Sequence, residues 1–452
     1  MAGRYKEYPE YRKSQIEWMH DVPVHWNNVP LKYMAIEDNS LFLDGDWIES
    51  KDISNEGIRY ITTGNVGEGI YKEQGGGFIS DETFKKLACT EVFEGDLLLS
   101  RLNAPIGRAC IVPNLSSRIV TSVDNVIFRP DPLYNKQFLV YLFSSASYFK
   151  HTSNLARGAT MQRISRGLLG NIRVVVPPLL EQQKIANFLD HETTKIDTLI
   201  TKQEKLIELL KEKRQAVISH AVTKGLNPDA PMKDSGVEWL GEVPERWVIK
   251  SYRYACKIYR GKFGHRPRND PAFYDGEYPF IQTGDVARAG KYIKDYKQTL
   301  NEKGVGVSQK FPVGTLMMAI AANIGDTAIL GFEAYAPDSV VGFKPKVDID
   351  LEFLRYSFMA ALPALEQTST QSTQANLNVD RIGAVQASFP SVSEQKEIVA
   401  YLDSLLEQYD DIESKSQKSI ELMNERKTAL ISAAVTGKID VRDWQEPKEQ
   451  QG

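Results

Sequence analysis

Two stretches of the chain share one pattern of apolar positions, which predicts two long helices. In residues 181–222 apolar side chains recur at intervals of three, four and seven, without an interrupting proline or glycine, and residues 394–435 repeat the pattern 213 positions later. This spacing is typical of helices that pack along their length, and we expect an antiparallel coiled coil. The predicted seam residues are Leu189, Ile196, Leu199, Leu206, Leu210, Val217, Leu402, Tyr409, Ile412, Met423 and Leu430.

Each predicted helix closes one of two similar halves of the chain. SQIEWMHDVPVHW at Ser14 is echoed by SGVEWLGEVPERW at Ser235, and YITTGNV at Tyr60 by FIQTGDV at Phe280. The offset between the copies drifts from 221 to 213, as expected when loops between strands gain or lose residues after a duplication. Two long surface helices on separate globules would also fit the apolar pattern, but the duplication favours pairing of the helices.

The repeats predict an α+β protein with two pseudo-repeated mixed α/β domains joined by the long helices. Short apolar runs such as DLLLS and TLMMAI, bounded by turn residues, indicate several short strands in each domain. The expected segments are a first domain at 1–178, a spacer helix at 179–225, a linker at 226–235, a second domain at 236–391, a second spacer helix at 392–438 and a mobile tail at 439–452.

Composition limits the class of protein. The chain has 452 residues, 42% of them hydrophobic, which is enough for two sizeable cores. Cys89, Cys110 and Cys256 show no CxxC spacing and suit a reducing compartment. The N-terminal residues are polar and the longest apolar run, residues 316–324, is too short for a bilayer, so we expect a cytoplasmic protein without a membrane partner.

The net charge of −4 does not suggest nucleic acid, but two local stretches do. Residues 132–180 and residues 246–269 contain no acidic residue and carry repeated Lys and Arg, as expected of phosphate-facing surfaces. Tyr252, Tyr254, Tyr259 and Phe263 are interleaved with the second set of charges. Alternatively, these aromatic residues could lie on the core side of a strand with Lys and Arg on its solvent-exposed side, which would explain about half of the residues in 246–269.

Two polar loops offer side chains that read base edges. Residues 157–166 (RGATMQRISR) provide Arg, Gln and Thr, and residues 367–378 (QTSTQSTQANLN) are rich in Gln, Asn, Ser and Thr. Ordinary loop and cap roles for these residue types remain the alternative. The candidate DNA-binding residues are Thr63, Asn65, Arg101, Asn103, Lys150, Arg157, Thr160, Gln162, Arg163, Arg166, Arg260, Lys262, His265, Arg266, Arg268, Thr283, Asn323, Gln371, Ser372, Gln374 and Asn376.

Recognised catalytic motifs are missing from the sequence. There is no GxxxxGK[ST] phosphate loop, HExxH, GxSxG turn or clustered Cys/His metal spacing. We therefore expect no catalytic residue, no metal and no cofactor. Within residues 181–222 seven Lys/Arg balance seven Asp/Glu, which suits a solvated helix pair with protein partners.

As a set, these motifs resemble the specificity subunit of type I restriction-modification enzymes. The resemblance covers residues 14–437 and rests on the EW…VPxxW openings, on EQQKIANFLD at Glu181 and EQKEIVAYLD at Glu394, and on TTGNV and QTGDV. It implies a non-catalytic subunit with two target-recognition domains, each reading one half of a bipartite, asymmetric site in double-stranded DNA.

The resemblance also implies partners. Two methyltransferase subunits would dock on the helices, and restriction subunits would join in the full complex. An orphan specificity protein without a restriction partner would have the same sequence features. A self-contained enzyme would need motifs that are missing, and a protein-only scaffold would leave the acid-free stretches without a reason.

Overall fold

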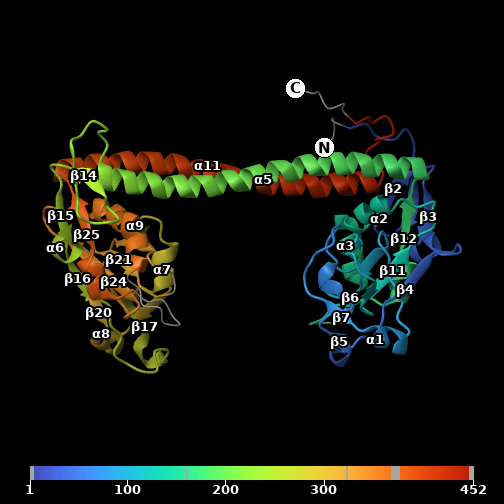
Figure 1. Cartoon of the computed structure of the whole chain (residues 1–452), viewed down its shortest axis with the longest axis horizontal. Coiled ribbons are helices and arrows are strands. Elements are labelled where there is room, and N and C mark those ends of the chain that lie inside the picture. Colours follow the sequence, from blue (N-terminus) through green and yellow to red (C-terminus); the bar gives the residue numbers. More distant parts are fainter. Residues whose placement is uncertain (1–4, 159, 322–323, 368–376, 447–452) are drawn as a thin grey trace. The chain divides into compact units, whose positions relative to one another are not determined.

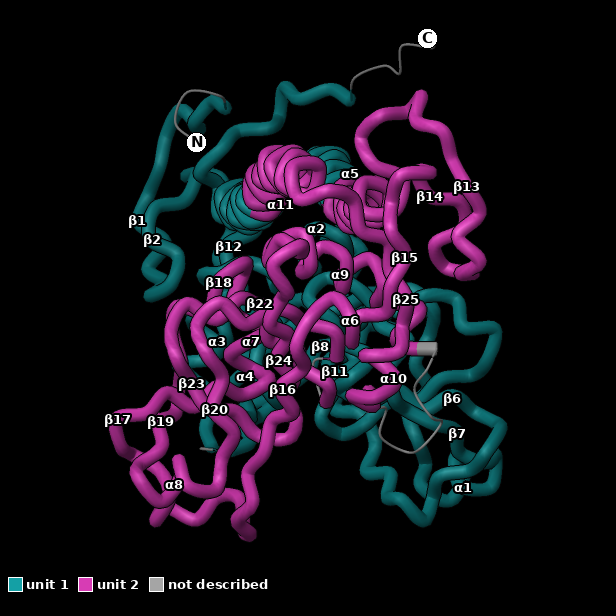
Figure 2. Tube along the Cα trace, turned by 90° about the vertical axis from the view of Figure 1, so that its left-hand side faces the viewer, with its two compact units in different colours: residues 1–203, 418–452 teal, residues 204–417 magenta. Residues whose placement is uncertain are grey.

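The computed structural model describes residues 5–158, 160–321, 324–367 and 377–446. It divides into two compact units, which Figure 2 colours separately: unit 1 holds residues 1–203 and 418–452, and unit 2 holds residues 204–417. The sequence suggested the long helices as segments of their own. Instead, each unit combines a strand-rich domain with one half of each helix.

The described residues of unit 1 form four small sheets and several short helices, many of which are labelled in Figure 1. The sheets have the orders β1-β2, β10-β6-β7-β5, β4-β11-β8-β9 and β12-β3. The elements are β1 (Tyr11–Ile16), β2 (Met19–Pro23), β3 (Asn27–Pro30), β4 (Leu41–Asp44), β5 (Ile53–Ser54), β6 (Ile58–Ile61), β7 (Gly77–Ile79), α1 (Asp81–Lys86), β8 (Leu97–Ser100), β9 (Ala109–Ile111), β10 (Ile119–Thr121), β11 (Asn125–Arg129), α2 (Lys136–Phe143), α3 (Ala146–Leu155), α4 (Arg166–Asn171) and β12 (Arg173–Val176), with 3-10 turns at Leu31–Met34, Ser50–Asp52 and Thr63–Asn65.

Unit 2 repeats this plan. Its sheets have the orders β13-β14, β15-β25, β16-β24-β21-β22-β18 and β19-β17-β23-β20. The elements are β13 (Met232–Asp234), β14 (Glu242–Pro244), β15 (Val248–Ser251), α6 (Tyr252–Ala255), β16 (Cys256–Arg260), β17 (Tyr274–Phe280), α7 (Thr283–Arg288), β18 (Tyr292–Ile293), β19 (Gln298–Leu300), α8 (Glu302–Val307), β20 (Gln309–Phe311), β21 (Leu316–Ala319), β22 (Thr327–Leu330), β23 (Ala334–Ala336), β24 (Val340–Pro345), α9 (Leu351–Gln367), α10 (Val379–Ala384) and β25 (Gln386–Phe389), with a 3-10 turn at Pro271–Phe273.

The strand pairings repeat as well. In unit 1 a parallel pair, β10 with β6, stands in an otherwise antiparallel sheet, and β17 pairs in parallel with β23 in unit 2. The apolar runs predicted as strands are β8 and β21, and every residue of both is buried. Successive residues of each strand enter two different hydrophobic cores, one on each face of the sheet, so neither strand alternates with polar residues. The duplication and the α+β class are therefore confirmed.

The long helices are α5 (Leu179–Lys224) and α11 (Val392–Val435). In unit 1 the first half of α5 belongs with the second half of α11, and in unit 2 the second half of α5 belongs with the first half of α11. The two helices therefore run antiparallel. Lys427 pairs with Asp197 at 2.7 Å in unit 1, and Lys211 with Glu413 at 3.8 Å in unit 2. Such exposed ion pairs contribute little, so packing along the seam must hold the helices together.

The buried seam differs from the predicted one at three positions. Leu199, which is 50% exposed, Leu206 and Ile412 flank the buried seam and are not part of it. Ile200 and Ile207 are turned inward instead, because neighbouring residues on a helix point about 100° apart. Buried or half-buried positions follow a strict three-four spacing at Thr193, Ile196, Ile200, Gln203, Ile207, Leu210, Arg214 and Val217, and at Leu402, Leu406, Tyr409, Glu413, Ser416, Ile420, Met423, Lys427, Leu430 and Ala434.

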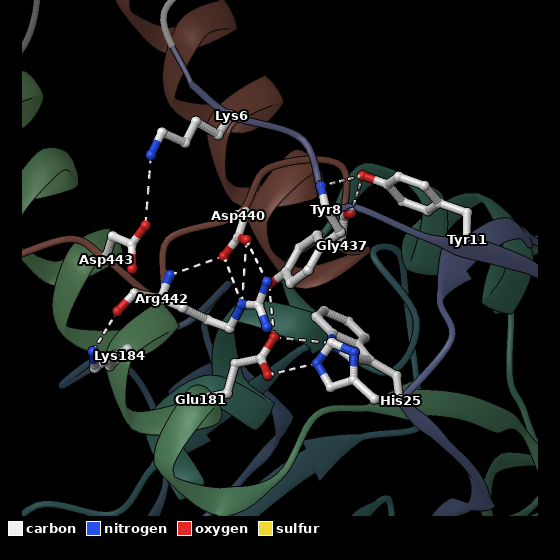
Figure 3. Close-up of polar contacts among 11 residues, drawn as sticks. Lys6, Tyr8, Tyr11, His25, Glu181, Lys184, Gly437, Asp440, Arg442 and Asp443 are labelled. Carbon is white, nitrogen blue, oxygen red and sulfur yellow. Dashed lines mark hydrogen bonds and ion pairs between the residues drawn. The ribbon is translucent and has the colours of Figure 1, made fainter.

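A buried carboxylate joins the start of α5 to the opening segment of unit 1. Glu181 accepts hydrogen bonds from Tyr8 Oη at 2.7 Å and Trp26 Nε1 at 3.0 Å, and its second oxygen lies 2.8 Å from His25 Nε2. Burial and the bond to Glu181 raise the pKa of Tyr8. Figure 3 shows Tyr8, His25 and Glu181 converging at this point.

The repeated Glu-Gln motif works in the same way in both units. Glu394 accepts a hydrogen bond from Trp247 Nε1 at 3.1 Å, in the place of Glu181 and its tryptophan. Gln182 and Gln395 each donate to the carbonyl five residues upstream, at 2.8 and 2.9 Å. The motif therefore fastens each long helix to the domain before it, which explains why both copies carry the same residues.

The C-terminal segment is packed rather than mobile up to residue 446, against expectation. Asp440 N donates to the carbonyl of Lys6 at 2.8 Å, while Ile439 and Val441 are buried in the core of unit 1. Trp444 packs edge-on against Phe188 of α5. Figure 3 shows Lys6 beside Asp443, with which it forms an ion pair. The many charged residues of this segment led to the prediction of a mobile tail, although apolar residues alternate with them. Residues 447–452 lie outside the described part of the chain.

Candidate nucleic-acid interface

The predicted loop at residues 157–166 is a closed hairpin between α3 and α4. Arg157 and Arg163 exchange both backbone hydrogen bonds, at 2.9 and 2.8 Å. Gly158 has φ +110°, and a Cβ atom there would lie 2.3 Å from the carbonyl oxygen of Met161. Glycine is therefore required at this turn. Thr160 and Met161 are exposed at the tip.

Neighbouring residues fasten this hairpin to the end of β8. Asn103 N donates to Gln162 O at 2.9 Å, so these two candidates lie side by side, Asn103 exposed and Gln162 half-buried. Arg101 is 4% exposed; its Nη1 donates to Ile164 O at 3.1 Å and its Nε lies 3.0 Å from Asp44 Oδ1. Arg101 therefore supports the loop from beneath, and we remove it from the set facing DNA.

Residues 132–180 contain no acidic residue, but in the folded structure carboxylates from other segments contact their arginines. Arg163 pairs with Asp124 at 2.7 Å, and Arg166 approaches Asp44 at 3.8 Å. Both carboxylates come from strands or turns outside residues 132–180, which a charge count along the chain cannot see. Lys150 and Arg157 are exposed. These two cations are the strongest phosphate-binding candidates of the loop region.

The turn that follows β6 carries Thr63 and Asn65. Asn65 is fully buried: its Oδ1 accepts from Thr62 N at 2.9 Å and its Nδ2 donates to Lys72 O at 2.9 Å. It closes the turn and does not face solvent, so we remove Asn65 from the candidate set. Thr63 beside it is half-buried and keeps its place.

Unit 2 forms the same kind of turn at the start of α7. Asp285 Oδ2 accepts from Gln282 N at 2.9 Å, in the role that Asn65 has in unit 1. Thr283, the counterpart of Thr63, is half-buried at the first position of α7. The two turns share their backbone and differ in the side chain that closes them.

The basic loop of unit 2 begins at the end of β16 with Arg260 and Lys262, both exposed. Gly261 between them is required, since a Cβ atom there would lie 1.9 Å from Pro337 O. Arg266 lies 3.6 Å from Asp338, and Arg268 pairs with the same carboxylate. One negative charge thus offsets part of this positive surface.

His265 in the same loop is held within the protein. Its Nε2 lies 3.0 Å from Asp270 Oδ2, and its ring stacks on Phe273 at 4.0 Å. The backbone N–H of Ala272, together with His265, lowers the pKa of Asp270. His265 is therefore better suited to shaping the loop than to reading a base.

The interleaved aromatics of unit 2 divide between core and surface. Tyr252 is buried and stacks on Phe358 at 3.9 Å, and Phe263 is also buried. Tyr254 is exposed and Tyr259 half-buried. Half of the set is thus core, as the alternative interpretation required.

Five candidates lie outside the described residues, namely Asn323, Gln371, Ser372, Gln374 and Asn376. In the described ranges, no group of three or more His, Cys, Asp or Glu side chains is placed to hold a metal ion. Nor does any helix there have the length and apolar content to span a membrane.

Comparisons with known proteins agree on one family. The model of the type I restriction modification DNA specificity domain matches residues 26–209 and 244–422. A Methanocaldococcus jannaschii protein assigned as the MjaX type I restriction enzyme specificity subunit is 24% identical, over 81% of this chain and 83% of its own length. The EcoKI specificity subunit of Escherichia coli K12 is 22% identical, over 69% of this chain and 68% of its own.

Solved structures share the fold. A chain from work on complex assembly and conformational transition of the type I R-M system matches with a TM-score of 0.71 and 16% identity, covering 92% of this chain and 98% of that one. The HsdS subunit of Thermoanaerobacter tengcongensis matches over the same shares with a TM-score of 0.56 and 17% identity. The chain therefore belongs to the specificity-subunit family of type I restriction-modification enzymes, as a non-catalytic DNA-recognition subunit.

Proposed function

We propose that each unit reads one half of a bipartite, asymmetric site in double-stranded DNA. The observation that carries this proposal is that two units of one fold carry their exposed basic side chains on different loops, between α3 and α4 in unit 1 and after β16 in unit 2. Unit 1 offers a closed hairpin with exposed Arg157, and unit 2 offers a basic loop from Arg260 to Arg268. Equivalent scaffolds with different polar surfaces suit two different half-site sequences.

We further propose that the outer face of the helix pair binds two methyltransferase subunits, and that restriction subunits join this core. In unit 1 α5 exposes Leu199 beside the buried seam, and in unit 2 it exposes Leu206 and Leu209. Exposed leucines in each unit support a protein partner. The nearly balanced charge of α5 fits a protein surface better than DNA.

Coexpression with the neighbouring methyltransferase subunit tests this function. Methylated positions would be read across genomic DNA by single-molecule sequencing. A two-part motif with a fixed gap is the expected result. A single-part motif would contradict reading by both units. A stable complex without new methylation would instead support an orphan specificity protein.

A further inference from the structure

One arginine that the sequence did not single out ties the candidate loops of unit 1 together. Arg108 lies immediately before β9 and is half-buried. Its guanidinium lies within hydrogen-bond distance of five backbone carbonyl oxygens, with the two N–H groups of Nη1 shared among three of them. The acceptors are Thr63 O at 2.8 Å, Val66 O at 2.7 Å, Leu102 O at 3.1 Å, Asn103 O at 2.8 Å and Pro105 O at 3.2 Å.

These carbonyls belong to two loops, 63–66 and 102–105. The second loop is bonded to the hairpin at residues 157–166 through Asn103 N and Gln162 O, 2.9 Å apart. A single side chain thus connects the backbones that carry Thr63, Asn103 and Gln162. The planar fork of a guanidinium, with five N–H donors in fixed directions, suits carbonyls in two loops at once.

The guanidinium of Arg108 also keeps its positive charge, and none of its hydrogen-bond acceptors is a carboxylate. Its five acceptors are neutral carbonyls, whereas Arg163 and Arg166 contact carboxylates. Burial lowers the pKa of Arg108 and attraction to Glu68 partly offsets this, but an arginine stays protonated in proteins. A positive charge without a contacting carboxylate therefore lies directly beneath loops that would approach a phosphate backbone.

Unit 2 is built differently at the same place. PIGRACIV at Pro105 aligns with NIGDTAIL at Asn323, so Asp326 stands where unit 1 has Arg108. Ile320 stands in the place of Arg101, because Ala319 N donates to Asp326 O just as Ser100 N donates to Arg108 O. Neither residue can form the five-carbonyl contact. The arrangement is thus particular to unit 1, and a defect in it should affect one half-site.

We propose that Arg108 is the positioning residue for base reading by unit 1. It holds three candidate reading loops in one arrangement and supplies positive charge beneath them. This inference rests on the proposed function, because it assigns a role within half-site recognition. Arg108 itself need not touch a base.

The test uses the full chain in complex with its methyltransferase subunits. Arg108→Lys keeps the charge but loses the fork, and Arg108→Gln loses both. Arg118→Gln is the matched control, since Arg118 pairs with Glu91 and Asp81 at 3.0 and 3.2 Å. Thermal unfolding verifies that each variant folds, sequencing of methylated DNA gives the motif, and equilibrium binding uses duplexes altered in one half-site at a time.

In both Arg108 variants, discrimination in one half-site should fall on the order of tenfold, with the other half-site unchanged. Arg108→Gln should in addition weaken binding to unrelated duplex DNA and lower its salt dependence, while Arg108→Lys should not. Arg118→Gln should match the wild type. Equal loss in both half-sites, or folded Arg108 variants with wild-type discrimination, would overturn the inference alone. A wild-type complex that methylates no two-part motif would overturn the proposed function and this inference with it.

Discussion

Replacing the two equivalent glutamates of the Glu-Gln motif by alanine should destabilise the two units unequally. Glu181→Ala leaves the N–H of Trp26 and the O–H of Tyr8 without their acceptor, and these residues are only 1% and 4% exposed. Each buried donor left unpaired costs about 1–3 kcal/mol. The half-exposed His25 can turn to water and adds little. The expected loss is about 2–6 kcal/mol.

Glu394→Ala is the internal comparison, because it removes the acceptor of one buried donor. Trp247 is 2% exposed and loses a 3.1 Å bond. The expected loss is about 1–3 kcal/mol. Against a typical domain stability of about 5–15 kcal/mol, the first variant should remove a larger share of the stability of unit 1 than the second removes from unit 2, which should stay folded.

Amide hydrogen exchange followed by mass spectrometry can measure the two units separately. Glu181→Ala should speed exchange in β3, and Glu394→Ala should speed it less in β15. Urea unfolding of the full chain gives the corresponding loss of total stability. A larger effect from Glu394→Ala, or equal acceleration in both units from either variant, would refute the reasoning.

Three further predictions concern surfaces and helices. Arg157→Ala should weaken binding of the complex to all duplexes alike and reduce the salt slope by about one, measured by titration at several salt concentrations; a change of motif would contradict a phosphate role. Ile200→Asn should lower the melting temperature whereas Leu199→Asn should not, and only Leu199→Asn should weaken copurification of the methyltransferase subunit at unchanged stability; the reverse pattern would restore the originally predicted seam. Inserting one heptad into the middle of each long helix keeps the seam register and adds about 10 Å, so methylation sequencing should find a gap wider by about three base pairs with both half-sites unchanged; an unaltered gap would show that the helices do not set it.

Repetition in the sequence accounts for most of what could be predicted. Two copies of a Trp-containing opening, of buried strands and of the Glu-Gln motif indicated two similar α+β domains and two long helices. The family followed from the same motifs. These features are readable because local periodicity and repeated residues survive divergence even where loops change length.

The helix seam shows where sequence periodicity stops being sufficient. Leu199 and Ile200 are both apolar, so the sequence permits either one inside. In the structure Ile200 packs towards the other helix and Leu199 remains exposed. A helix face is selected by its partner, which apolar spacing along one chain cannot specify when two adjacent residues are equally apolar.

By itself, the sequence determined the duplication, the fold class, the two long helices and the family, because these depend on local pattern. Only the tertiary structure decided which charges remain available. It brought Asp44 and Asp124 against Arg166 and Arg163 of a stretch without acid, buried Arg101, and placed Arg108 under two loops. Each of these outcomes depends on residues distant in the chain, and the free energy of a charge is set by its neighbours in space rather than by its neighbours in sequence.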